Sequence, residues 1–106
     1  IVREEDGLAM SSRNMLLNPQ QRRAAPLIYK TLQKAKELMT ELTPAQLKAY
    51  VTEQINVSSE LKTEYAELVD AGSLQAVKAW DDAASVQLCV AVMVGKIRLI
   101  DNIKLK

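Results

Sequence analysis

The chain has 106 residues, 48% of them hydrophobic and 25% charged, and its 14 basic and 13 acidic side chains leave a formal net charge of +1. This length suffices for one domain with a single core, and no apolar run approaches the roughly 18 residues of a membrane-spanning helix. The near-neutral charge argues against a nucleic-acid partner, which requires a concentrated basic patch. We therefore expect a single domain that binds neither nucleic acid nor a membrane.

Histidine is absent, and cysteine occurs once, at Cys89. Without histidine this chain cannot supply a Ser-His-Asp or Cys-His catalytic set or a His-ligated metal site. A lone cysteine forms neither an intramolecular disulfide nor a Cys-based zinc cluster, a pattern typical of a reducing compartment. We predict no metal site in the chain and a cytoplasmic location, and we expect Cys89 to be a small core residue because it stands in an apolar run.

Residues 1–17 follow neither the period of a strand nor that of a helix, which predicts an exposed loop with a short extended start. Ser11, Ser12 and Arg13 occupy three consecutive positions in this loop. Hydroxyl and backbone N–H groups donate to phosphate oxygens, and a planar guanidinium pairs with two such oxygens at once. The triplet therefore indicates phosphate binding, against the alternative that it is a solvated loop.

Two segments carry the signature of a helix start, Asn18-Pro19-Gln20-Gln21 and Thr43-Pro44-Ala45-Gln46. Each has a capping side chain, proline at the first helical position and glutamine three residues after the cap. The first predicts a helix from Pro19 to about Glu41, which Pro26 should kink or divide. The second predicts a helix to about Lys62, and the short link between the two predicts antiparallel packing.

After Lys62 the hydrophobic period changes to that of strands. It predicts strands over residues 64–70, 86–94 and 97–103, the second of them central and covered on both faces. Gly95-Lys96 predicts a type II′ hairpin turn, whereas residues 74–84 show no clear pattern. The predicted class is α+β, with two long helices packed on a small antiparallel sheet of about three strands that ends in a C-terminal β-hairpin.

Most of the chain resembles a known family. The run Val2-Arg3-Glu4-Glu5-Asp6-Gly7-Leu8-Ala9-Met10-Ser11-Ser12-Arg13-Asn14 closely resembles the start of the C-terminal domain of the pantoate–β-alanine ligases, or pantothenate synthetases. These belong to the cytidylyltransferase-like adenylate-forming superfamily, and their Met-Ser-Ser-Arg is the counterpart of the K-M-S-K-S loop. Residues 95–103 resemble the closing hairpin of the family, whereas residues 74–84 depart from its pattern.

The resemblance implies an activity. The family joins pantoate to β-alanine with ATP and Mg²⁺ through a pantoyl adenylate, and it releases pantothenate, AMP and pyrophosphate on the route to coenzyme A. No prosthetic group is implied. We expect Mg²⁺ to be held mainly by nucleotide phosphates and water, and we interpret the acidic run Glu4-Glu5-Asp6 as solvated residues.

The resemblance also implies a site. Matched by position, the ATP-binding residues are Val2, Met10, Ser11, Ser12 and Arg13, and the backbone of Val2 corresponds to one that contacts adenine. Ser11, Ser12 and Arg13 are the implied catalytic groups, because they would stabilise charge that develops on the phosphates in the transition state.

In the family, a His-x-Gly-His element, the pantoate and β-alanine pockets and the dimer interface belong to a Rossmann-like N-terminal domain. The sequence begins without methionine and inside a motif, so we interpret residues 1–106 as the C-terminal lid domain alone and expect it to be inactive by itself. Its implied partners are ATP and the N-terminal domain of a homodimeric parent. Two alternatives stay open: a stand-alone α+β dimerisation or interaction module, and the K-M-S-K-S-type loop domain of an aminoacyl-tRNA synthetase.

Overall fold

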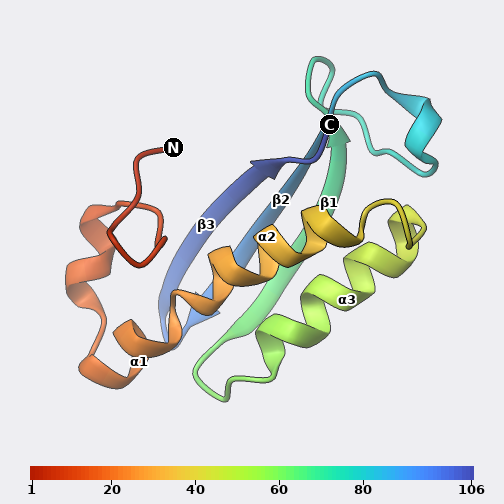
Figure 1. Ribbon diagram of the computed structural model, residues 1–106. Helices are drawn as coiled ribbons and strands as arrows, with labels where there is room; N and C mark the ends of the chain where they lie inside the picture. The colour runs from red at the N-terminus through yellow and green to blue at the C-terminus, as the bar shows by residue number, and fades with distance from the viewer.

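The computed structural model describes all 106 residues and has the predicted α+β architecture. A three-stranded antiparallel sheet of order β1-β2-β3 carries α2 and α3 on one face (Figure 1). Helix α3 packs on β1, and α2 packs on β3 and on α3. In chain order the elements are the 3₁₀ helix η1 (Ser12–Leu16), α1 (Pro19–Ala24), α2 (Leu27–Leu38), α3 (Pro44–Asn56), β1 (Lys62–Asp70), the 3₁₀ helix η2 (Trp80–Asp82), β2 (Val86–Val94) and β3 (Ile97–Lys104).

Both predicted helix starts are confirmed as capping boxes. The side chains of Asn18 and Thr43 accept hydrogen bonds from the N–H groups of Gln21 and Gln46, at 2.8 Å and 3.2 Å. Pro26 divides the first helix into α1 and α2, the second of the two outcomes expected, because proline supplies no N–H and its ring would clash with the carbonyl of Arg22, four residues earlier.

The C-terminal end of α3 was predicted wrongly. The helix ends at Asn56 rather than near Lys62, and the Asn56 side chain accepts a hydrogen bond from the Thr63 N–H at 2.8 Å. This bond ties the end of the helix to the start of β1, which begins at Lys62 rather than at residue 64. Leu61 is still buried, with 4% of its surface exposed, but it reaches the core from the connecting turn.

The central strand β2 is covered on one face only, contrary to the prediction. Its residues alternate between buried and half-buried positions except at Ala91, which is buried on the second face, and no helix lies on that face of the sheet (Figure 1). On that face Gln87 donates a hydrogen bond to the Asn102 side chain at 3.2 Å. Cys89 lies there too, half-buried rather than in the core, and partial burial raises the pKa of its thiol. Apolar residues at both alternating sets of positions had predicted two covered faces. The prediction failed because apolar side chains also occur on exposed faces.

The turn between β2 and β3 has the predicted geometry. Gly95 has a φ of +62°, whereas Lys96 has no positive φ, which is the combination that a type II′ turn requires. After β1, Asp70 accepts from the N–H groups of Gly72 and Ser73. Within residues 74–84, which gave no clear pattern, Trp80 donates to the distant Leu42 carbonyl. No helix of the protein has the length and apolar character needed to cross a membrane.

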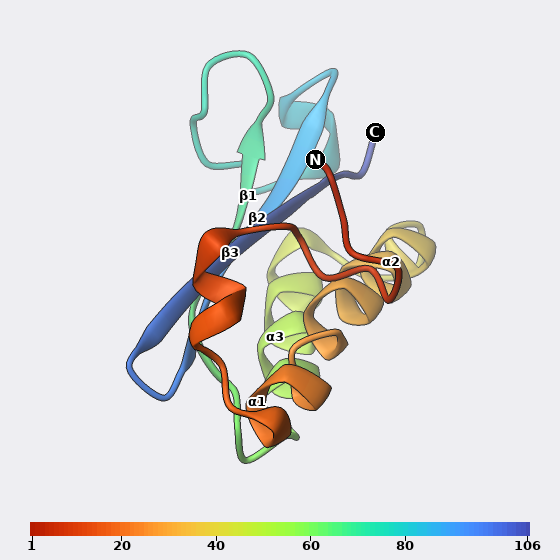
Figure 2. The same ribbon diagram turned by 90° about the vertical axis from the view of Figure 1, so that its left-hand side faces the viewer.

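The N-terminal segment is more ordered than the exposed loop that was predicted. Arg3 and Ala9 form an isolated antiparallel bridge, which closes a small turn around Gly7, and Leu8 enters the core with 3% of its surface exposed. Figure 2 shows this segment beside β3 and α2, where η1 also contacts β3. The predicted site residues therefore rest on a folded base.

Candidate functional site

A backbone hydrogen bond fixes the place where the loop that carries Ser11, Ser12 and Arg13 leaves the N-terminal turn. The Met10 N–H donates to the Val2 carbonyl at 2.9 Å, so these two residues lie side by side although eight positions separate them. The Asn14 side chain donates to the Ala9 carbonyl at 3.0 Å and closes the loop behind the serines. Asn14 was not singled out from the sequence, because an asparagine in a loop carries no distinguishing signal.

Val2 and Met10 expose most of their surface, 72% and 53%. The Val2 carbonyl is engaged by Met10, but the Val2 N–H makes no hydrogen bond within the chain. Both residues thus present apolar side chains and one free backbone donor beside the loop. A flat, partly apolar ring with an acceptor atom at its edge has the chemistry to bind there.

Ser11 and Ser12 have different roles in the loop. Ser11 is the N-cap of η1, and its hydroxyl oxygen accepts from the Arg13 N–H at 3.1 Å. The hydroxyl of Ser11 can still donate its own hydrogen. Ser12 is exposed, and its hydroxyl has no partner within the chain. Two hydroxyl donors are therefore available to an anion.

The structure does not bring the whole triplet to one hollow. Ser12 lines an open hollow of about 560 Å³, whereas Arg13 lines a separate one of about 350 Å³ against β3. Met10 and Ser11 line both and form the wall between them. The sequence suggested three convergent groups, but η1 turns consecutive side chains to different sides.

Arg13 is turned toward the sheet. Its guanidinium donates to the Arg98 backbone carbonyl at 3.2 Å, and the bond is exposed to solvent. An exposed hydrogen bond adds little net stability because water can replace either partner, so the side chain can leave this position readily. Arg13 would have to turn away from Arg98 to meet an anion held by the serines.

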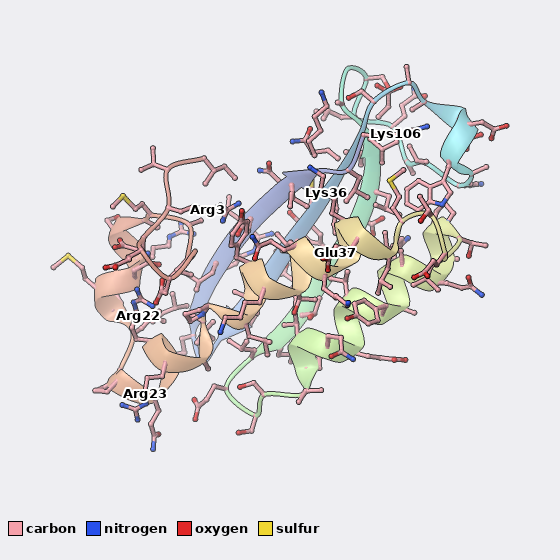
Figure 3. The ribbon with its side chains drawn as sticks, viewed as in Figure 1. Arg3, Arg22, Arg23, Lys36, Glu37 and Lys106 are labelled. Atoms are coloured by element: carbon pink, nitrogen blue, oxygen red, sulfur yellow. The ribbon has the colours of Figure 1, made fainter.

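Arg22 is the cation that sequence reasoning missed. It lines the same hollow as Ser11 and Ser12, and its guanidinium pairs with Asp6 at 2.7 Å. In Figure 3 Arg22 points toward the N-terminal turn, whereas its neighbour Arg23 points away from it. Adjacent arginines in a short helix look alike in a sequence, and only the fold shows which one faces the loop.

The larger hollow, which holds both serines, has few oxygen ligands for a cation such as Mg²⁺. Glu4 is its only carboxylate, and Asp6 is engaged by Arg22. No group of three or more His, Cys, Asp or Glu side chains in the protein is arranged to hold a metal ion. A magnesium site made by this chain alone does not fit these residues, since Mg²⁺ takes six oxygen ligands in octahedral geometry.

Asp6 gives a pH-dependent prediction. The Arg22 hydrogen bond lowers the pKa of Asp6 below its ordinary value. The ion pair therefore stabilises the folded protein above the unfolded pKa of about 3.9, and that stabilisation is lost as the pH falls through the lower folded value. We expect Arg22→Gln to move the carboxyl-carbon titration midpoint of Asp6 upward, and Arg23→Gln to leave it in place. An Asp6 midpoint that is the same in Arg22→Gln and in the unaltered protein would contradict the pairing.

Together the fold and the site define a class: an α+β domain that presents hydroxyl donors, a free backbone donor and flanking guanidinium groups on a loop at one side of its sheet. The family follows from direct comparison. A family model described as pantoate-beta-alanine ligase matches residues 1–104, and the chain belongs to that family.

Curated relatives support the same family assignment. The chain is 44% identical over 104 residues to a pantothenate synthetase of Porphyromonas gingivalis, with 98% of this chain and 37% of the relative covered. It is 44% identical over 106 residues to a pantothenate synthetase of Bacteroides thetaiotaomicron, with 100% and 38% covered. The chain thus spans well under half the length of the curated relatives it matches.

Solved structures show the same arrangement. The pantothenate synthetase of Thermus thermophilus superimposes with a TM-score of 0.86 at 33% identity, covering 98% of this chain and 37% of that one. A pantoate-beta-alanine ligase of Francisella tularensis, complexed with beta-gamma ATP and beta-alanine, has the same fold with a TM-score of 0.60 at 24% identity, covering 98% and 31%.

Proposed function

We propose that residues 1–106 are the C-terminal, ATP-loop domain of a ligase that joins pantoate to β-alanine through a pantoyl adenylate, with release of AMP and pyrophosphate. The observation that carries the proposal is the family match, which runs through residues 1–104 and so includes the whole loop. The alternative of an aminoacyl-tRNA synthetase domain is wrong, because the chain belongs to a different family.

ATP fits the donors that this loop presents. The free N–H of Val2 would meet an acceptor at the edge of adenine, beside the exposed side chain of Met10. The hydroxyls of Ser11 and Ser12 would donate to phosphate oxygens in the larger hollow. A nucleotide in the Francisella ligase supports ATP as the occupant. Mg²⁺ would enter with the triphosphate.

Arg13 would act in the chemical step. Attack of the pantoate carboxylate on the α-phosphorus breaks the bond to pyrophosphate, and negative charge moves onto the leaving group. A guanidinium that turns from the Arg98 carbonyl toward the triphosphate would stabilise that charge with a pair of hydrogen bonds. The bond to Arg98 is weak enough for this exchange, and loop closure of this kind can gate a reaction.

The remaining parts of the reaction belong to the rest of the parent protein. The chain spans 37% of the P. gingivalis relative, it contains no histidine, and the hollow that holds both serines is open to solvent. We place the pantoate and β-alanine sites and the dimer contact in the other part of a cytoplasmic parent enzyme. The chain alone should then not catalyse the reaction.

Pyrophosphate release tests the proposal. The complete synthetase that carries this chain should release pyrophosphate when given pantoate, β-alanine and MgATP, and the 106-residue chain alone should release none above the protein-free rate. Turnover by the chain alone would contradict the division of labour between domains. A complete protein whose pyrophosphate release does not depend on pantoate would contradict the ligase assignment, since adenylation consumes that acid.

A stand-alone interaction module is separated from this proposal by nucleotide binding. Amide shifts of Val2, Met10, Ser11, Ser12 and Arg13 should move when ATP is added to the complete protein. A stable dimer of the chain with no shift at these positions would favour the interaction module.

A further inference from the structure

We propose that Arg3 and Asp101 form a positioning pair that holds the base of the ATP loop on β3, and that adenylate formation depends on it. The proposal rests on the function proposed above. Neither residue lines the larger hollow, which holds both serines, although Asp101 lines the smaller one beside Arg13. The pair would therefore act through Val2 and Met10 rather than on phosphates held by the serines.

The Arg3 guanidinium is held by four hydrogen bonds to two separate parts of the chain. Two of them go to the Asp101 carboxylate, at 2.7 Å and 2.9 Å, in the paired geometry that a guanidinium and a carboxylate favour. The others reach the carbonyls of Gly7, at 3.0 Å, and Asn102, at 3.3 Å. One side chain thus joins the turn of the N-terminal segment to β3.

The pair is well shielded from water. The side chain of Asp101 is 3% exposed and that of Arg3 is 18% exposed, whereas those of the Asp6–Arg22 pair are 44% and 34% exposed. Removing one member would leave a buried charge without its partner, which is far more costly than breaking an exposed pair. Figure 3 shows Arg3 between the N-terminal turn and β3.

Helix α2 joins the same arrangement through Tyr29. The Arg3 guanidinium carbon lies 3.7 Å from the centroid of the Tyr29 ring, a cation–π contact. The ring also lies so close to Gly7 that a Cβ there would come within 2.5 Å of it. Three parts of the fold, the N-terminal turn, α2 and β3, therefore meet at one guanidinium.

The pair is directly coupled to the groups that would hold ATP. Arg3 bridges to Ala9, and in the next position of this antiparallel pairing Val2 and Met10 share a hydrogen bond of 2.9 Å. A shift of Arg3 would move both the free Val2 N–H and the start of the serine loop. The loop thus meets β3 at two points with different strengths: the buried pair at Asp101 and the exposed bond of Arg13 to the Arg98 carbonyl.

This difference suggests the division of roles. The buried anchor keeps the adenine side of the loop in place, while Arg13 remains free to turn toward the phosphates. A misplacement of about 1 Å in a positioning element can reduce a rate by about 100-fold. Lysine at position 3 would keep the charge but could not make the forked bonds to Asp101 and the bonds to both carbonyls.

The test uses the complete synthetase with Arg3→Lys and Asp101→Asn. We measure pantoate-dependent exchange of labelled pyrophosphate into ATP, which reports adenylate formation, per folded molecule and well below each melting temperature. We expect kcat to fall by about 10- to 100-fold in both variants, with the KM for pantoate changed less than about twofold. Lys48→Met, which removes the exposed Lys48–Glu67 pair, is the control and should leave kcat unchanged.

Each outcome decides the proposal. A kcat within about twofold of the unaltered enzyme in a folded Arg3→Lys or Asp101→Asn variant, even with a lowered melting temperature, would overturn it, because that pattern is a stability role alone. An equal loss in Lys48→Met would overturn it too. If Asp101→Asn does not fold, Arg3→Lys decides. An unaltered enzyme without pantoate-dependent exchange would instead contradict the proposed function.

Discussion

Replacing Arg13 by alanine in the complete synthetase should lower the rate of adenylate formation by about 100- to 1,000-fold, the range seen when one donor to a developing charge is removed. The KM for ATP should change much less. The reason is that Arg13 is bound to the Arg98 carbonyl in the protein without nucleotide, and it would meet the phosphates only as charge moves onto pyrophosphate. An interaction made only in the transition state affects kcat rather than ground-state binding.

The measurement is single-turnover formation of pantoyl adenylate at saturating ATP and pantoate. Arg23→Ala is the matched control, because Arg23 is an exposed arginine that makes no ion pair and points away from the loop (Figure 3). Arg13→Lys should recover part of the loss, since it restores the charge without the fork. An adenylation rate in Arg13→Ala equal to that of Arg23→Ala would refute the role of Arg13.

Replacing Gly7 by alanine should lower the free energy of unfolding of the 106-residue chain by about 2–4 kcal/mol. Gly7 has a φ of +95°, where a side chain strains the backbone. Its new Cβ would lie 2.5 Å from a carbon of the Tyr29 ring, so the ring would have to move. Tyr29 cannot shift without disturbing the Arg3 guanidinium stacked on it.

Urea unfolding followed by the fluorescence of Trp80 measures this effect. Gly72→Ala is the control, because Gly72 has no positive φ and its Cβ would meet only one carboxylate oxygen, at 3.3 Å. A Tyr29→Leu background should reduce the cost of Gly7→Ala by removing the clash but not the backbone strain. A loss of stability in Gly7→Ala no greater than that in Gly72→Ala would show that the turn accommodates a side chain freely.

Features that depend on neighbouring residues were predictable from the sequence. The caps at Asn18 and Thr43 and the turn at Gly95 each use hydrogen bonds or backbone angles within a few positions. The end of α3 and the open face of β2 were not predictable in this way. The first depends on a bond from Asn56 to Thr63, and the second depends on which face of the sheet the helices cover.

The candidate site likewise has features that the local sequence predicts and features that only the tertiary structure determines. The sequence by itself predicted Ser11, Ser12 and Arg13 as site residues and indicated the family, because these residues are contiguous and their side-chain chemistry can be read from the motif alone. Only the tertiary structure decided that Ser12 and Arg13 face different hollows and that Arg22 stands beside the serines. It also placed Asp101 on Arg3, across 98 positions of the chain. No periodicity or spacing links residues so far apart, since their contact exists only once the N-terminal turn packs on β3.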